Sequence, residues 1–71
     1  MANNIRAYLN HVPQIAASAF IDPSAVIIGR VSIAENVSIW CNAVIRGDVA
    51  AISIGENSNV QDLTMLHVTH D

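Results

Sequence analysis

Two histidines, His67 and His70, stand three residues apart within "SNVQDLTMLHVTHD", the last stretch of the 71-residue sequence. Imidazole nitrogens are common ligands of zinc and other transition metals, so this pair raises the question of a metal site. On a straight strand, residues at this spacing point to opposite faces and chelate one ion poorly. We therefore expect the two histidines to have different roles.

The elements that position these histidines follow from a repeat of six residues. A period of six is a multiple of the two-residue repeat of a strand and fits the 3.6-residue turn of a helix poorly. A hexapeptide repeat is typical of a parallel β-helix. Nine aliphatic residues form the series, and three extra residues are inserted in its middle. The series is Ile15, Ile21, Ile27, Ile33, Ile39, Ile45, Ile54, Val60 and Leu66.

Three hexapeptides make one coil, so residues 18 apart should stack, and residues 21 apart should stack across the insertion. This arithmetic predicts that Arg46 lies directly beneath His67 on an outer face, next to the insertion. Insertions in solenoids tend to lie on the functional face. The predicted columns are Ile28, Arg46 and His67; Asp22, Trp40 and Gln61; Arg30 and Asp48; and Val31, Val49 and His70.

Composition excludes several classes of function. With 52% hydrophobic and 13% charged residues the chain is too apolar to be disordered, yet no apolar run approaches the ~18 residues of a membrane span. A net charge of −3, with three arginines and no lysine, argues against a nucleic-acid partner. The start, "MANNIRAYLN", lacks the apolar core of a signal peptide, so we expect a cytoplasmic protein without a membrane partner.

The repeat also divides the chain. Residues 1–12 fit no repeat, and we expect them to form an irregular lead-in or cap, followed by a hexapeptide-repeat β-helix over residues 13–71. The nine repeat positions amount to about three coils, which is near the minimum for a solenoid, and terminal coils need capping. Because nothing caps the C-terminal end, we expect the chain to be a fragment of a longer solenoid.

Three blocks of sequence carry a resemblance to a known family: "VIRGDV" at 44–49, "IGENSNVQD" at 54–62 and "LHVTH" at 66–70. On a hexapeptide ladder, they resemble the gamma-class carbonic anhydrase family, whose relatives include hexapeptide-transferase-like and ferripyochelin-binding-like proteins. The resemblance runs over residues 12–71. It implies an all-β, left-handed parallel β-helix that assembles as a homotrimer and holds zinc, or sometimes iron or cobalt, between subunits.

The resemblance also implies roles for single residues. His67 matches the first of three histidine ligands; the other two lie further along the family's chains, one of them on the neighbouring subunit. Arg46 and Asp48 match a pair that joins subunits near the metal. Gln61 matches a residue that positions the bound water or bicarbonate. In the archetypal enzyme, glutamates that shuttle protons stand at the positions of Val49 and His70, so proton transfer would pass to His70 or be slow.

Plainer interpretations of the same residues stay open. His67 could be a surface histidine and His70 a corner residue bonded to the backbone. Arg46 and Asp48 could form a local salt bridge, which at an exposed site is worth about 0–1 kcal/mol. Gln61 could be an amide that caps the ladder.

The activity implied is reversible hydration of CO2 to bicarbonate by a metal-bound hydroxide at a trimer interface. Two alternatives remain: a hexapeptide acyltransferase that uses acyl-CoA, which the ladder alone fits equally well, and a trimeric structural relative without catalysis, which Val49 favours. The full-length trimer would be the enzyme. The 71-residue chain, with at most one of the three ligands, is predicted to be inactive alone.

Overall fold

The computed structural model describes residues 4–67, and in this range the chain forms eight strands and no helix. Two strands are long, β4 (Val26–Ile33) and β6 (Val44–Ile54). The short strands are β1 (Ile5–Arg6), β2 (Gln14–Ile15), β3 (Phe20–Ile21), β5 (Ser38–Ile39), β7 (Asn59–Val60) and β8 (Met65–His67). No helix able to span a membrane is present in this part of the chain.

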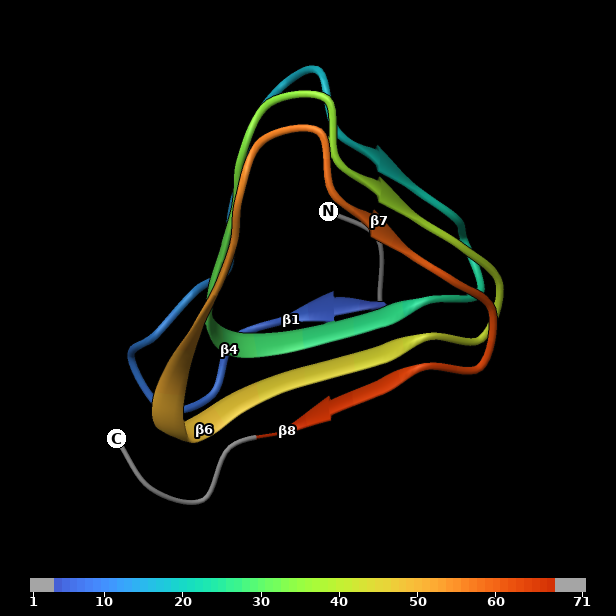
Figure 1. Ribbon diagram of the computed structural model, residues 1–71. Coiled ribbons are helices and arrows are strands. Elements are labelled where there is room, and N and C mark those ends of the chain that lie inside the picture. The colour runs from blue at the N-terminus through green and yellow to red at the C-terminus, as the bar shows by residue number, and fades with distance from the viewer. Residues whose placement is uncertain (1–3, 68–71) are drawn as a thin grey trace.

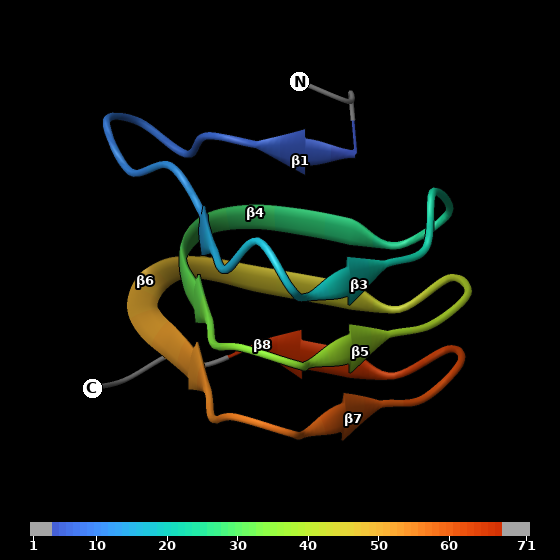
Figure 2. The same ribbon diagram turned by 90° about the horizontal axis from the view of Figure 1, so that it is seen from above.

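The strands wind into a triangular solenoid. One sheet contains β1, β2, β4, β6 and β8 and covers two faces, because β4 and β6 bend around a corner; β3, β5 and β7 form the third face. All the pairings between these strands are parallel. In Figure 1 the chain runs clockwise as it advances toward the viewer, and Figure 2 shows the coils stacked side by side. The predicted left-handed parallel β-helix is confirmed.

The aliphatic ladder fills the interior in the predicted register. Ile27 pairs with Ile45 and Ile45 with Leu66 on one face, and Ile39 pairs with Val60 on another. Ile27, Ile39 and Ile45 are fully buried, and burial of such a side chain contributes about 1.5–3 kcal/mol. Small residues complete the core at the second position of the repeat: Ala25, Val31, Val37 and Ala43.

Several corners use left-handed backbone. Asn36 and Asn42 have φ angles of 59° and 58°, which asparagine tolerates better than most residues. A serine one coil earlier holds each corner, because the backbone N–H of Asn36 donates to Ser18 Oγ and that of Asn42 to Ser24 Oγ. Leu63 takes the same conformation, φ 65°, with a side chain that is 75% exposed.

The inserted residues form a bulge where β4 and β6 turn their shared corner. Gly29 pairs with Gly47, 18 residues further along the chain, whereas Val31 pairs with Ile52, 21 residues further along. The three extra residues therefore enter between Gly47 and Ile52. The predicted stacking of Val31 beneath Val49 is therefore wrong. Ile52 takes that core position, and Val49 belongs to the bulge, where it is 58% exposed.

Before the first coil, the described residues add a strand to its edge. Ile5 and Arg6 of β1 pair with β4, and the Asn4 side chain donates to the Ala25 carbonyl at 2.9 Å. Tyr8 and His11 then close a small antiparallel bridge. This segment lies at one end of the stack in Figure 2, so it covers the edge of β4 opposite to β6.

Candidate functional site

Arg46 and His67 meet on the outer face of β6 and β8. The two residues are register partners, as the predicted step of 21 residues requires. Arg46 Nη2 lies 3.3 Å from both Nδ1 and Nε2 of His67. A donor in the ring plane at equal distances from both nitrogens would collide with the carbon between them. The guanidinium therefore lies against the face of the imidazole.

Asp48 joins this pair from the bulge. Its Oδ1 lies 2.9 Å from His67 Nε2, and its Oδ2 lies 3.3 Å from Arg46 Nε. Oδ1 also accepts the backbone N–H of Val49 at 2.6 Å. The Val49 N–H, the largest cause, and the contacts with His67 and Arg46 hold the pKa of Asp48 below its ordinary value of 3.8. Asp48 is therefore a carboxylate at neutral pH.

The contacts within this cluster add little to the stability of the fold. The Arg46 side chain is 43% exposed, and solvent screens an ion pair so exposed, so the pair contributes little to stability. Arg46 Nε is buried without a hydrogen-bond partner, so its contact with Asp48 is an ion pair rather than a directed hydrogen bond. The His67 and Asp48 side chains are only 21% and 18% exposed. The cluster therefore offers polar and charged groups at the surface rather than stability.

Gln61 lies on a different face of the triangular solenoid. It follows β7 in the sheet of β3, β5 and β7, whose register sets it in line with Trp40. Trp40 Nε1 donates to Asn59 Oδ1 at 2.7 Å, and its ring lies 5.0 Å from that of Phe20. Between residues 4 and 67 no hydrogen bond or ion pair joins Gln61 to His67. The structure brings Arg46, Asp48 and His67 together and leaves Gln61 apart.

The donor set fits a metal only in part. His67 offers an imidazole at the surface, but nowhere in residues 4–67 do three His, Cys, Asp or Glu side chains come together to hold an ion. Catalytic zinc sites use three protein ligands and keep one position for water. His70 lies outside the described residues. This part of the chain can therefore supply one ligand, and a complete site needs others.

Arg30 was not assigned a role from the sequence. Its Nη2 donates to the carbonyl oxygens of Asp48 at 2.8 Å and of Val49 at 2.5 Å. The available signal was its spacing, because Arg30 precedes Asp48 by one coil of 18 residues. Stacking arithmetic describes backbones, however, and cannot show that a side chain spans the bulge.

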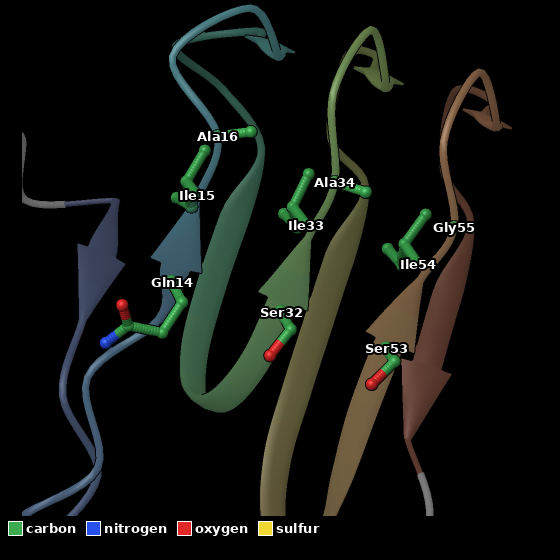
Figure 3. Close-up of a pocket in the computed structure, with 9 residues that line it drawn as sticks. All are labelled: Gln14, Ile15, Ala16, Ser32, Ile33, Ala34, Ser53, Ile54 and Gly55. Atoms are coloured by element: carbon green, nitrogen blue, oxygen red, sulfur yellow. The ribbon is translucent and has the colours of Figure 1, made fainter.

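The larger sheet carries a shallow groove of about 530 Å³ over β2 and the ends of β4 and β6, after these two strands have turned their corner. Figure 3 shows that each coil contributes one polar, one aliphatic and one small residue to the lining, and that these residues line up from coil to coil. None of the lining side chains is titratable, so this groove offers no acid, base or metal ligand. The lining residues are Gln14, Ile15, Ala16, Ser32, Ile33, Ala34, Ser53, Ile54 and Gly55.

Comparison with known proteins agrees with the repeat. The family model "Bacterial transferase hexapeptide (six repeats)" matches residues 13–47. A protein named carbonic anhydrase from Geobacillus kaustophilus is 54% identical over 63 residues, which is 89% of this chain and 35% of that protein. Gamma carbonic anhydrase 2, a mitochondrial protein of Arabidopsis thaliana, is 46% identical over 56 residues, 79% of this chain and 20% of that protein.

A solved structure shows the same architecture. The hexapeptide transferase family protein from Anaplasma phagocytophilum superposes with a TM-score of 0.89 at 43% identity, covering 92% of this chain and 39% of that one. The chain thus spans about 20–39% of the length of these relatives. The family model itself ends at Gly47, within the first coils.

Proposed function

Since this chain belongs to the hexapeptide-repeat family, where it is similar to proteins named gamma carbonic anhydrase, we propose that it contributes to a metal-dependent site for reversible hydration of CO2. The observation that carries the proposal is the cluster of His67, Asp48 and Arg46 at the only register shift between β4 and β6. Zinc is the metal proposed, with iron or cobalt as alternatives, in a homotrimer located in the cytoplasm.

The separation of Gln61 from His67 supports the homotrimer. Gln61 follows β7 and His67 lies in β8, which belong to different sheets, and no hydrogen bond or ion pair of residues 4–67 joins the two side chains. A second copy could lay its Gln61 face on the His67 face of the first. A contact between two different faces is heterologous, and with three-fold rotation it closes into a ring. Each interface of such a ring would hold one complete site.

The residues of this chain have separable tasks in the proposed site. His67 would bind the metal, which when present lowers the pKa of a bound water to about 7. Asp48 and Arg46 fix the orientation of the imidazole, one at a ring nitrogen and the other at the ring face. The exposed Arg46 guanidinium also offers a cation to the bicarbonate anion.

Proton transfer is the step to which the bulge contributes least. Val49, exposed within the bulge, has no group that can carry a proton. We propose that His70 takes this task, because an imidazole titrates near neutral pH. A trimer that had lost catalysis would lack this proton transfer. Slow hydration of CO2 with metal bound would support that alternative.

A hexapeptide acyltransferase remains the second candidate, and the match to a hexapeptide transferase family protein favours it. Acyl-CoA carries phosphate groups, which proteins bind with arginine, lysine or backbone N–H groups. The groove beside β2 has no cationic lining. A smaller pocket next to it is lined by Arg30 and His11, but Arg30 Nη2 is already bonded to the carbonyls of Asp48 and Val49. The described residues therefore fit CO2 hydration better than acyl transfer.

The test compares His67→Ala with His11→Ala in the assembled protein. His11 is a matched control, because it lies in the N-terminal bridge with Tyr8 and makes no hydrogen bond or ion pair with Arg46, Asp48 or His67 among the described residues. We expect His67→Ala to lower metal affinity by more than about 100-fold, above the effect of losing an outer partner, and to abolish CO2 hydration. His11→Ala should retain both. Full metal content in His67→Ala, or saturable coenzyme A binding without hydration in the wild type, would contradict the proposal.

A further inference from the structure

Arg30 bridges two coils at the point where the ladder between them is broken. It stands in β4 between Gly29, which pairs with Gly47, and Val31, which pairs with Ile52. Residues 48–51 therefore have no register partner in β4. Backbone groups that leave a ladder need other partners. Arg30 Nη2 supplies one, donating to the carbonyls of Asp48 and Val49.

The backbone holds Arg30 tightly in this place. A Cβ on Gly47 would lie 2.4 Å from the Arg30 carbonyl oxygen, and one on Gly29 would lie 2.5 Å from the Gly47 carbonyl oxygen. Gly29 also has φ +82°, which glycine adopts without strain. Such close approach of β4 to β6 leaves room for no side chain between them. At this corner the Arg30 Nε is buried without a hydrogen-bond partner, and Nη2 makes the contacts with the bulge.

Arg30 is connected to His67 through the backbone of Asp48 and Val49 and through the Asp48 side chain. The Val49 carbonyl accepts from Arg30, and the Val49 N–H donates to Asp48 Oδ1. The Asp48 carbonyl also accepts from Arg30, while Oδ1 contacts His67 Nε2 at 2.9 Å. Among the described ion pairs none involves Arg30, so its charge is directed to these two carbonyls.

We infer that Arg30 is a positioning residue that holds the bulge backbone and thereby directs the Asp48 carboxylate at His67. This inference rests on the proposed function only for its catalytic consequence. A donor bound to both carbonyls restricts the two peptide units on either side of the Val49 Cα, the first of which carries the Val49 N–H. Arginine suits the task because Nη2 has two N–H groups, one for each carbonyl, in a planar group of fixed geometry, whereas a lysine ammonium sits on a flexible stem.

The experiment compares Arg30→Met, Arg30→Lys and Arg6→Met in the assembled protein. Arg6 is a matched control, an exposed arginine on β1. Two quantities are measured: hydrogen exchange of the Val49 amide, and zinc affinity by competition with a chelator. We expect Arg30→Met to accelerate the exchange at Val49 about tenfold or more and to lower zinc affinity about 10–100-fold, as loss of a partner that orients a ligand does. Arg30→Lys should recover part of each, and Arg6→Met should change neither.

The outcomes separate the two proposals. Unchanged exchange at Val49 in Arg30→Met overturns the positioning role, as does equal loss in Arg6→Met. If the wild type binds no zinc while Arg30→Met still accelerates exchange at Val49, the proposed function fails and the positioning role stands. If Arg30→Met does not fold, Arg30→Lys decides: wild-type exchange at Val49 together with wild-type zinc affinity overturns the inference, and a graded change in both supports it.

Discussion

One six-residue repeat builds both the face formed by β3, β5 and β7 and the corner shared by β4 and β6. The two regions differ in strand register and in the interactions of their outer side chains. On the first, Phe20 pairs with Ser38 and Ser38 with Asn59 without a register shift. On its outer side Trp40 packs against Phe20 and donates to Asn59, and neither ion pair of the described residues lies there. At the second, the ladder slips by three residues, and both ion pairs of the described chain lie beside the slip.

The difference shows what a break in a ladder makes available. In the regular face the strands pair with the next coil without a register shift, and the outer side chains pack along the surface. The bulge releases residues 48–51 from that constraint. Asp48 can then turn its carboxylate to His67, one coil away, while Arg30 satisfies the carbonyls that the slip exposes. Regular repeats position this site, and the irregular segment supplies its polar groups.

The largest expected effect is in the regular part of the molecule. Ile39→Ala removes a fully buried side chain at the centre of the β3, β5 and β7 face. We expect a loss of about 2–5 kcal/mol in the free energy of unfolding, because close-packed coils cannot collapse onto the cavity. Val49→Ala, in the exposed bulge, should change it by less than about 0.5 kcal/mol. Urea denaturation at fixed protein concentration measures both, and equal losses would contradict the comparison.

A second pair of substitutions tests how closely the coils approach at the bulge. Gly47→Ala places a Cβ 2.4 Å from the Arg30 carbonyl oxygen, whereas Gly55→Ala meets no atom within 4 Å. We expect Gly47→Ala to cost about 1–3 kcal/mol, since backbone must move to admit the methyl group. Gly55→Ala should stay within about 0.5 kcal/mol of the wild type. If Gly47→Ala is as stable as Gly55→Ala, the close contact at the corner is not maintained in solution.

The repeat made most of the fold predictable, because a β-helix core is read from spacing alone. The step of 21 residues placed Arg46 against His67, and the step of 18 placed Ile28 beneath Arg46, as observed. Both pairings lie outside the inserted segment. The same arithmetic failed at Val49, because it assigned the insertion no definite starting residue. Counting shows that three residues are extra, but local sterics at Gly47 decide where they enter.

The candidate site was less predictable than the ladder. The contact of Asp48 with His67 depends on the path of the bulge, and the reach of Arg30 depends on a side-chain conformation. Neither follows from a period. Leu63 is similar, since a leucine is not expected at φ 65° and only the corner geometry imposes it. The roles of Gln61 and His70 stay predictions, because one depends on a second copy and the other lies outside the described residues.

The smallest expected effect compares two aspartates, one from each region. The pKa of Asp22 is lowered chiefly by the Ser24 hydroxyl, at 2.6 Å, and that of Asp48 chiefly by the Val49 N–H. Each carboxylate therefore binds protons less tightly in the folded than in the unfolded chain. The stability they contribute is fully present above the unfolded pKa, about 3.8, and is lost as the pH falls through the lower, folded pKa. Acid should thus weaken both regions below about pH 4.

Only one of the two aspartates should respond to His67. Removing the imidazole in His67→Ala deletes the second cause of the lowered pKa of Asp48 and leaves the Val49 N–H in place. The pKa of Asp48 should therefore rise but stay below 3.8, while that of Asp22, bonded to Ser24, should not move. Carboxyl-carbon NMR titration of the metal-free protein measures both. An unchanged Asp48 would mean that the contact with His67 does not form in solution, and an equal rise at Asp22 would mean that His67→Ala disturbs the whole solenoid rather than the bulge.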